Sequence, residues 1–351
     1  MKSKAAIQVE AGGPLVIEEI EVPDPGPNQV TVRTFASGVC YSQVHQLASP
    51  GLPRPMGLGH EGSGVVTRVG KEVTHVAEGD HVISTWVPRN PIRGLPVSRP
   101  TGATFQGREL IADGDVYTWS EHMVTFEDKV VPMSQSDPTD ITCLIGCAVL
   151  TGAGAVLHTA KVSVGQSVAV LGAGGVGLSA IGAAAIVGAD PIIAVDLDDR
   201  KLQFAREFGA THGVNASSTD ALAAIWEINP GGVDYAFDAV GQPTTALQAI
   251  EAVREGGPRA DNQGGTAVLL GIPVSNVSID LNAILLYQRH YCGSLGATEP
   301  DTDFPLFLEW VRDGKFPLEK LVTDRYSLEQ ADEARIALEA GQILGRAIIE
   351  L

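Results

Sequence analysis

Cysteine and basic residues are both scarce in this chain, and each scarcity excludes a class of protein. Only four cysteines occur among 351 residues, too few and too scattered for a disulfide framework, so we expect reduced thiols. The 24 Lys and Arg residues against 42 Asp and Glu residues give a formal charge of −18. Nucleic acids and anionic membranes bind basic faces, so neither is expected as a partner.

Long apolar runs are also missing. The first eight residues contain no apolar segment of the kind that a signal peptide needs. The most apolar stretch, residues 178–193, is interrupted by Gly, Asp and Pro, which fits a helix, a turn and a strand better than a membrane span. We therefore expect a cytoplasmic protein, and its length is sufficient for two domains with a large core.

What the chain does contain is a glycine-rich loop in a specific setting. The short apolar run Val168–Leu171 precedes Gly172, Gly174 and Gly177, which have the spacing G-x-G-x-x-G, and the Ala-rich stretch 178–187 follows. In a dinucleotide site the first glycine permits a tight turn, the second lets the backbone approach a pyrophosphate, and the third lets helix and strand pack closely. A chain with 40 glycines can match this spacing by chance, but the order strand, turn and helix favours a dinucleotide site.

An acidic residue ends the next predicted strand. The strand 191–196 finishes at Asp196, 19 residues after Gly177. A carboxylate at this point accepts hydrogen bonds from the adenosine ribose and repels a 2′-phosphate. The sequence therefore predicts NAD rather than NADP.

The pattern of predicted elements changes near residue 150. Before it, short alternating runs separated by Pro and Gly predict a β-rich domain with strands over 4–10, 15–22, 29–34 and 63–69. After it, strands and helices alternate, which indicates a parallel sheet, with strands over 234–240 and 266–272 and a helix over 244–255. The chain ends in helices over 304–313 and 328–340 and a strand over 346–351.

Three residues of the β-rich part are candidate metal ligands: Cys40, His60 and Cys147. Two thiolates and an imidazole with a fourth position left open are the ligand set of a catalytic zinc site. Taken singly, each has an ordinary explanation, because Cys143 and Cys147 lie in an apolar run that suits inert core cysteines and a lone His is usually a surface residue. The ligands are 20 and 87 residues apart, so no local motif connects them.

Several segments together resemble the zinc-dependent alcohol dehydrogenases of the medium-chain dehydrogenase/reductase superfamily. They occur in the family's order: Gly38-Val-Cys40 with Ser42 and His45, Gly59-His-Glu-Gly-Ser-Gly64, Gly79-Asp80, Cys143-Leu-Ile-Gly-Cys147 with Thr151-Gly152, Gly172-Ala-Gly-Gly-Val-Gly177, and Val195-Asp196. The resemblance implies an α/β protein with a GroES-like catalytic domain over 1–148 and 296–351 and a Rossmann-type, doubly wound NAD-binding domain over 149–295. It also implies reversible hydride transfer between NAD and a primary or secondary alcohol.

The resemblance assigns roles near the metal. It implies one zinc ion held by Cys40, His60 and Cys147, with water or a substrate oxygen in the fourth position. Ser42 matches the hydroxyl that receives the alcohol proton, and His45 matches the far end of a relay to solvent. Glu61 matches a carboxylate behind the metal that either assists ligand exchange or is structural. Ser42 can also be read as an ordinary turn serine.

It assigns cofactor and substrate residues as well. Beyond Gly172, Gly177 and Asp196, the residues implied at the cofactor are Thr151, Gly174, Gly175, Val176, Lys201, Val240, Gly241 and Arg346. Arg346 matches an arginine that pairs with pyrophosphate, although a surface arginine is an alternative. Trp86 matches an aromatic residue that lines the inner substrate channel, and core packing is the alternative.

The chain departs from the family at three places. Many relatives hold a second, structural zinc on four cysteines, whereas no cysteine occurs here between Cys40 and Cys143, so we expect one zinc per chain and a segment 86–100 held by packing or by a partner subunit. Tyr41 replaces a basic residue that binds pyrophosphate. Gln43 replaces an aspartate that supports the histidine ligand, which predicts lower zinc affinity.

Other functions remain open at this level. One alternative is an NAD(P)H-dependent reductase of an activated double bond or an unusual ketone, and another is a nicotinoprotein that keeps its NAD through turnover. A third is a non-catalytic cofactor-binding protein. Relatives pair as homodimers or homotetramers, and the apolar stretch 280–286 is a candidate contact.

Overall fold

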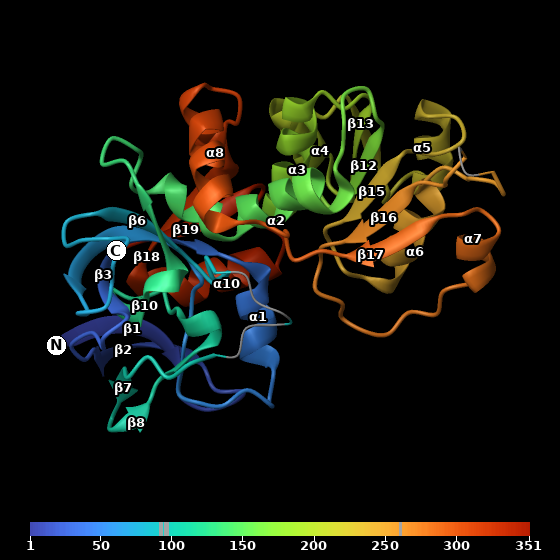
Figure 1. The fold of residues 1–351 in the computed structure, drawn as a ribbon. Coiled ribbons are helices and arrows are strands. Elements are labelled where there is room, and N and C mark those ends of the chain that lie inside the picture. Colours follow the sequence, from blue (N-terminus) through green and yellow to red (C-terminus); the bar gives the residue numbers. More distant parts are fainter. Residues whose placement is uncertain (91–93, 95–97, 260–261) are drawn as a thin grey trace. The chain divides into compact units, whose positions relative to one another are not determined.

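The computed structural model describes residues 1–90, 94, 98–259 and 262–351, and the chain divides into two compact units (Figure 1). The first unit contains Met1–Ala148, Glu299–Glu309 and Leu318–Leu351, and the second contains Val149–Thr298 and Trp310–Pro317. The domain limits expected from the sequence place all of 296–351 in the first domain, whereas here residues 296–298 and 310–317 pack with the second unit.

A seven-stranded sheet in the first unit has the strand order β11-β6-β5-β3-β19-β18, with β10 also paired to β3. Its strands are β3 (Gln29–Val39), β5 (Glu61–Val69), β6 (His81–Thr85), β10 (His122–Phe126), β11 (Val130–Met133), β18 (Val322–Ser327) and β19 (Arg346–Glu350). The last strand, β19, pairs antiparallel with β3, so that Ala347 faces Val39. The C-terminal strand therefore lies beside the strand that leads into Cys40.

A second sheet in this unit has the order β8-β7-β2-β1-β4-β9. Its strands are β1 (Lys2–Gln8), β2 (Leu15–Glu21), β4 (Met56–Gly57), β7 (Thr104–Phe105), β8 (Arg108–Glu109) and β9 (Ile111–Ala112). Side chains from both sheets, among them Ile7, Ile20, Val32 and Val82, form one buried cluster. Burial of these apolar faces, at about 25 cal/mol per Å², is what drives the two sheets together.

The helices of the first unit are short. They are α1 (Tyr41–Ala48), α9 (Leu318–Leu321), α10 (Ala331–Glu339) and the first part of α8 (Pro300–Arg312), with the 3-10 turns η1 (Asp113–Asp115), η2 (Glu127–Lys129), η3 (Ile141–Gly146) and η6 (Leu328–Gln330). No helix among the described residues combines the length and the apolarity needed to cross a membrane.

The second unit is a parallel six-stranded sheet flanked by helices (Figure 1). Its order, β14-β13-β12-β15-β16-β17, is 3-2-1-4-5-6 in chain order, the doubly wound arrangement of dinucleotide-binding domains. The strands are β12 (Val168–Leu171), β13 (Ile192–Asp196), β14 (His212–Asn215), β15 (Tyr235–Asp238), β16 (Thr266–Leu269) and β17 (His290–Gly293). The predicted α/β class with a doubly wound sheet is confirmed.

The helical segments of this unit precede its first strand or connect its strands. They are α2 (Ala148–Gly154), the π-helical η4 (Ala155–Ala160), α3 (Gly175–Val187), α4 (Asp199–Ala205), η5 (Arg206–Phe208), α5 (Ala221–Ile228), α6 (Pro243–Ala252) and α7 (Leu281–Leu285). The α3 helix begins at Gly175, within the glycine loop and three residues before the predicted stretch 178–187. It ends at Val187, and the next residue, Gly188, adopts a left-handed conformation with φ of +81°.

A charged cluster holds the described ends of the segment 86–100. Arg99 Nη2 lies 2.7 Å from both Asp115 Oδ2 and Asp128 Oδ1. The Lys129 ammonium, only 1% exposed, lies 3.7 Å from Asp115 and donates to the Trp86 carbonyl at 2.7 Å. These ion pairs and packing hold the part of the segment that the structure describes, where many relatives use a second metal.

Breaking this cluster is expected to destabilise the first unit. Asp115→Asn keeps the side-chain shape but leaves the buried Lys129 ammonium without its carboxylate, and loss of one partner of a buried pair costs about 3 kcal/mol or more. Urea unfolding measures this difference in the free energy of unfolding. Glu19→Gln, which breaks an exposed pair with Lys2, is the control and should cost less than about 1 kcal/mol. Equal effects of the two substitutions would contradict the assignment.

Candidate metal centre and cofactor site

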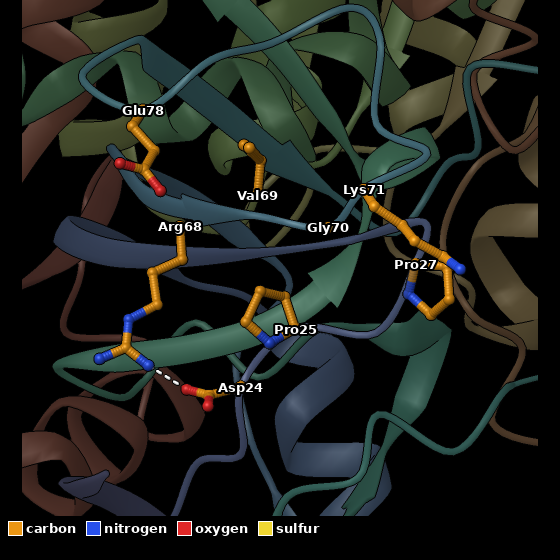
Figure 2. A pocket seen from close by; sticks show the side chains of 8 residues that line it. All are labelled: Asp24, Pro25, Pro27, Arg68, Val69, Gly70, Lys71 and Glu78. Carbon is orange, nitrogen blue, oxygen red and sulfur yellow. Dashed lines mark hydrogen bonds and ion pairs between the residues drawn. The ribbon is translucent and has the colours of Figure 1, made fainter.

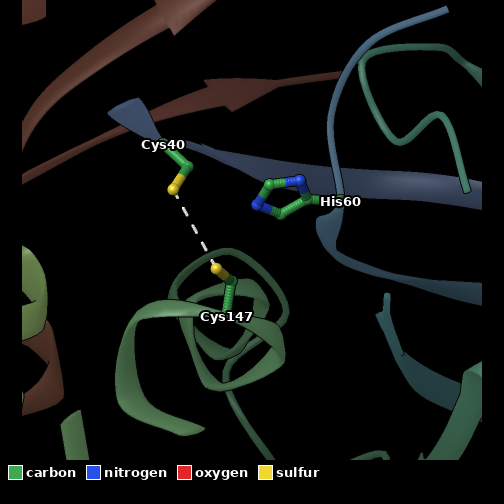
Figure 3. Close-up of side chains that lie close together, drawn as sticks. All are labelled: Cys40, His60 and Cys147. Carbon is green, nitrogen blue, oxygen red and sulfur yellow. Dashed lines mark hydrogen bonds between the residues drawn. The ribbon is translucent and has the colours of Figure 1, made fainter. Parts of the chain in front are cut away.

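The three candidate metal ligands come together in the first unit (Figure 3). Cys40 follows β3, His60 precedes β5 and Cys147 follows η3, and their ligand atoms all lie within 4.8 Å of one another. The two sulfur atoms are 4.0 Å apart, and all three side chains are at least nine-tenths buried. Two soft sulfur donors and one imidazole nitrogen converging on one point fit a zinc ion.

Glycines next to the ligands explain how the backbone brings them together. Gly59, directly before His60, has φ of +90°, and a Cβ there would overlap Trp119. Gly146, directly before Cys147, approaches the Ser84 carbonyl so closely that a Cβ would lie 2.5 Å from its oxygen. A side chain at either position would move a ligand away from the other two.

A buried ion pair lies behind the ligands. Glu61 is fully buried, and its Oε1 accepts hydrogen bonds from Arg346 Nε at 3.1 Å and Nη2 at 2.7 Å. Its other oxygen accepts from the Ala148 backbone N–H at 3.1 Å. One carboxylate thus connects β5, the C-terminal strand β19 and the backbone next to Cys147.

The charges of this pair shift each other's ionisation. Burial raises the pKa of Glu61 above the usual range of a carboxyl group, and Arg346 opposes that rise. Burial lowers the pKa of Arg346, but the charge of Glu61 and the nearby thiolates outweigh this effect, so its pKa is raised and it stays a cation. Arg346 therefore donates two hydrogen bonds to Glu61. Its contact with pyrophosphate stays a prediction.

The two ligand thiols lie close enough to change each other's ionisation. The hydrogen bond with Cys147 lowers the pKa of Cys40 well below that of a free thiol, and the same bond raises the pKa of Cys147. For His60, burial lowers the pKa, but the hydrogen bond and charge of Cys40 outweigh it and the pKa is raised. A thiolate is thus favoured at Cys40, and thiolates are the form that binds metal.

Cys143 differs from the ligand cysteines. Its Sγ donates to the Asp140 carbonyl at 3.1 Å, and burial raises its pKa well above the ordinary value. This is the environment of an inert core cysteine, the alternative that the sequence left open for both cysteines of the apolar run.

The remaining residues predicted near the metal lie on or beside α1. Ser42 Oγ is 3.2 Å from His60 Nε2. His45, one turn further along, packs edge-on against the ring of Tyr41 with a centroid distance of 5.3 Å, and Tyr41 is 45% exposed. Ser42 and His45 are three residues apart and so share one side of the helix. Their roles in a proton relay stay predictions.

Trp86 lies at the edge of the first unit's core. It packs against the apolar cluster that contains Val82, and a Cβ at Gly114 would lie 2.9 Å from the Trp86 Cβ. These contacts agree with the packing alternative. A role of the indole in a substrate channel stays a prediction.

The glycine loop of the second unit has the geometry that a dinucleotide requires. Gly172 adopts φ of +93°, and a Cβ at Gly177 would overlap the Gly172 carbonyl oxygen. Gly174 precedes α3 without a side-chain cap, and a Cβ at Gly174 would meet open space. The first N–H groups of α3 are therefore not capped by a side chain, which fits a pyrophosphate at this helix end.

Asp196 ends β13 beside this loop. Its Oδ2 accepts from the Ala173 N–H at 2.8 Å and its Oδ1 accepts from the Leu197 N–H at 2.7 Å. The carboxylate is thus fixed at the carboxyl end of the strand, where a ribose would be bound. Lys201 follows in α4, half-buried, and Thr151 is buried in α2.

Asp238 is a residue that the sequence reading overlooked. It is buried at the end of β15, and its Oδ1 accepts from the N–H groups of Val240 at 2.9 Å and Gly241 at 3.0 Å. Val240 in turn lies against Gly172, where a Cβ would be 2.6 Å from its Cγ2. Asp238 therefore holds the two predicted cofactor residues in place. An acid at a strand end three residues before a glycine was the available signal.

A separate hollow in the first unit is shown in Figure 2. It is lined by residues of both charges, and Arg68 pairs with Asp24 across it. None of the residues predicted for metal, cofactor or substrate lines this hollow.

Comparisons with known proteins agree with this geometry. The family model of the alcohol dehydrogenase GroES-like domain matches residues 26–135, and the model of the zinc-binding dehydrogenase matches residues 175–313. The chain is 33% identical to an alcohol dehydrogenase class-3 of Cereibacter sphaeroides, and the alignment covers 99% of this chain and 100% of that relative.

Two solved structures are similar over almost the whole chain. An alcohol dehydrogenase zinc-binding domain protein from Burkholderia ambifaria has a TM-score of 0.91 and 32% identity, covering 100% of this chain and 99% of that chain. Benzyl alcohol dehydrogenase from Acinetobacter calcoaceticus has a TM-score of 0.89 and 28% identity, with the same coverage.

The metal centre predicts one zinc ion per chain. Cys40→Ala removes one of two sulfur ligands, so it is expected to abolish zinc retention during purification. Cys143→Ala, which alters a buried cysteine of the same region, is the matched control and should retain the full amount. Elemental analysis by mass spectrometry measures the ratio. Two zinc ions per chain, or equal loss in both variants, would contradict the assignment.

Proposed function

The chain belongs to the zinc-dependent alcohol dehydrogenase family, whose members are oxidoreductases acting on CH–OH donors, and we propose how its own residues perform this reaction. The resemblance stated from the sequence motifs is thereby confirmed. The observation that supports the proposal most strongly is the convergence of Cys40, His60 and Cys147 within 4.8 Å. The reaction is reversible hydride transfer between NAD and an alcohol, with an aldehyde or ketone as the oxidised partner.

The metal ligands and the hydroxyl beside them divide the work. Cys40, His60 and Cys147 would hold the zinc ion, which would act as a Lewis acid and increase the acidity of an alcohol hydroxyl. We assign to Ser42, whose Oγ lies 3.2 Å from Nε2 of the histidine ligand, the role of accepting the proton that the alcohol loses. We assign to His45, which is half-buried on the same side of α1, the transfer of that proton towards solvent.

Glu61 and Arg346 act as positioning residues in this scheme. Their buried pair connects β5 and β19, the two strands on either side of β3, and the bond from the Ala148 N–H to Glu61 fixes the backbone next to Cys147. A ligand set held this firmly keeps its geometry when the fourth position exchanges water for substrate.

We propose NAD as the preferred cofactor. Asp196 is held at the end of β13 by three backbone N–H groups, those of Ala173, Leu197 and Asp198, and this fixes the position of its charge. A 2′-phosphate would meet this carboxylate at close range, and two negative charges in one site repel each other. The substrates proposed are primary and secondary alcohols.

The activity is tested by mixing NAD with linear, branched and aromatic alcohols and following reduced nicotinamide by absorbance. The purified protein is expected to form NADH with at least one alcohol. Ser42→Ala should lower kcat by about 100-fold or more because it removes the proton acceptor. Ser49→Ala, at the other end of the same helix, is the control and should have little effect. Absence of alcohol-dependent NADH formation, or equal rates in both variants, would contradict the proposal.

We also propose a homodimer formed through the second unit. The α7 helix exposes Leu281 and Leu285, and Leu286 directly after it is also exposed, at 75%, 68% and 63% respectively. Adjacent exposed leucines of this kind are typical of an interaction surface. A second copy of the chain is the proposed occupant, since self-association buries the same stretch on both subunits.

Sedimentation velocity tests the oligomeric state. The wild-type chain is expected to sediment as a dimer, and Leu285→Asp should shift it to monomer because a carboxylate would be buried in an apolar contact. Leu197→Asp, which changes another exposed leucine away from α7, is the control and should remain dimeric. A monomeric wild type would contradict the proposal.

The proposed compartment is the cytoplasm. All four cysteines are free, and Cys40 and Cys147 stand 4.0 Å apart, near enough for oxidation to compete with metal binding. A reducing compartment keeps such a pair available for zinc.

A further inference from the structure

Gln43 is the one fully buried amide side chain placed between two of the proposed zinc ligands among the described residues. It lies in the first turn of α1. Its Oε1 accepts a hydrogen bond from the Cys40 backbone N–H at 2.9 Å. Its Nε2 lies 2.9 Å from His60 Nδ1. One side chain thus contacts the backbone of one ligand and the ring of another.

The orientation of the His60 ring fixes which nitrogen binds a metal. Nδ1 is in contact with Gln43, whereas Nε2 is the nitrogen near Ser42, and Figure 3 shows a ring nitrogen on the side of the two sulfur atoms. A neutral imidazole that binds metal through Nε2 carries its hydrogen on Nδ1. Metal binding therefore turns Nδ1 into a hydrogen-bond donor.

The amide of Gln43 cannot satisfy both neighbours in that state. The Cys40 N–H is a donor in every state, and Nδ1–H of metal-bound His60 is a second donor. A carboxamide has a single acceptor oxygen, and its NH₂ group only donates. With Oε1 towards Cys40, the NH₂ group faces Nδ1–H, and if the amide flips, the NH₂ group faces the Cys40 N–H instead. Either orientation leaves two donors in contact in a buried place.

We propose that Gln43 is a positioning residue that weakens zinc binding, because Gln43 loses one of its two hydrogen bonds when His60 binds the metal. Without metal, Nε2 lies 3.2 Å from the Ser42 hydroxyl, and a neutral imidazole with its hydrogen on Nε2 accepts from Gln43 through Nδ1, so that both bonds are made. With metal bound through Nε2, one of the two bonds is lost. The inference rests on the zinc site of the proposed function and adds to it a reason why this centre releases its metal more readily than one supported by a carboxylate.

Two substitutions separate this account from a simple supporting role. Gln43→Glu has the same length and offers two acceptor oxygens, so both donors of the metal-bound state are satisfied and zinc should bind about 10- to 100-fold more tightly. Gln43→Met is neutral and unbranched and removes both bonds, so metal binding no longer costs a bond and zinc affinity should equal or exceed that of wild type. If Gln43 supported the metal, Gln43→Met would instead weaken zinc binding about tenfold or more.

The measurement is the zinc dissociation constant, from competition with a chromophoric chelator, on folded full-length protein checked by circular dichroism. The same two substitutions at Gln29 are the matched control, because this buried glutamine bonds Gly26 N–H at 2.8 Å and the Thr101 carbonyl at 3.1 Å and is no part of the proposed metal centre. They should leave the zinc constant unchanged. The methionine variant also covers the case in which a buried carboxylate prevents folding.

The outcomes distinguish this inference from the proposed function. Tighter zinc binding in Gln43→Glu without weakening in Gln43→Met supports the inference. Weaker zinc binding in Gln43→Met, or no gain in zinc affinity in a folded Gln43→Glu, overturns the inference. In either case, one zinc ion per chain in wild type leaves the proposed function intact. Absence of zinc binding in wild type and in every variant overturns the proposed function itself.

Discussion

The buried pair of Glu61 and Arg346 is the interaction on which the metal centre depends. Residues 285 positions apart in sequence meet there, and the second Glu61 oxygen reaches the Ala148 N–H, so one carboxylate fixes three separate pieces of backbone. Gly38 packs against this carboxylate so closely that any side chain there would overlap it. Loss of either charge would leave the other buried and unpaired, at a cost of about 3–5 kcal/mol. The pair therefore stabilises the ligand geometry rather than merely the fold.

In the second unit, the topology of the parallel sheet determines where the cofactor site lies. Successive strands are added on one side of β12 as far as β14 and on its other side from β15 onwards, so the strand order reverses between β12 and β15. Both the glycine loop and the Val240–Gly241 turn lie at the carboxyl ends of these two strands. Close approach decides the residue types, because Gly172 and Gly177 have no room for a side chain. Carboxylates then fix the turns, Asp196 by bonding Ala173 and Asp238 by bonding Val240 and Gly241. Backbone and acid together form a rigid edge for a dinucleotide.

Much of this was predictable where the signal is local. The glycine spacing, the acid at Asp196 and the apolar periodicity indicate the second unit and its fold, because each reflects contacts within a few residues. The extent of β3 could not be predicted from the sequence, because its end at Val39 is set by pairing with β19 and β5 and not by an alternating pattern. The partner of Arg346 and the Lys129–Asp115 pair were missed for the same reason, because each pairs charges that only the tertiary fold brings together. Gln43 was recognised as a departure, but its conflict between two donors requires the distances.

The ligand set is the central claim, and X-ray absorption at the zinc edge of the purified protein tests it most directly. We expect two sulfur atoms at about 2.3 Å, from Cys40 and Cys147, and one imidazole nitrogen at about 2.0–2.1 Å, from His60, with one further light atom in the open position. A shell with four sulfur atoms, or one with only nitrogen and oxygen, would contradict the account, because neither can be built from Cys40, His60 and Cys147.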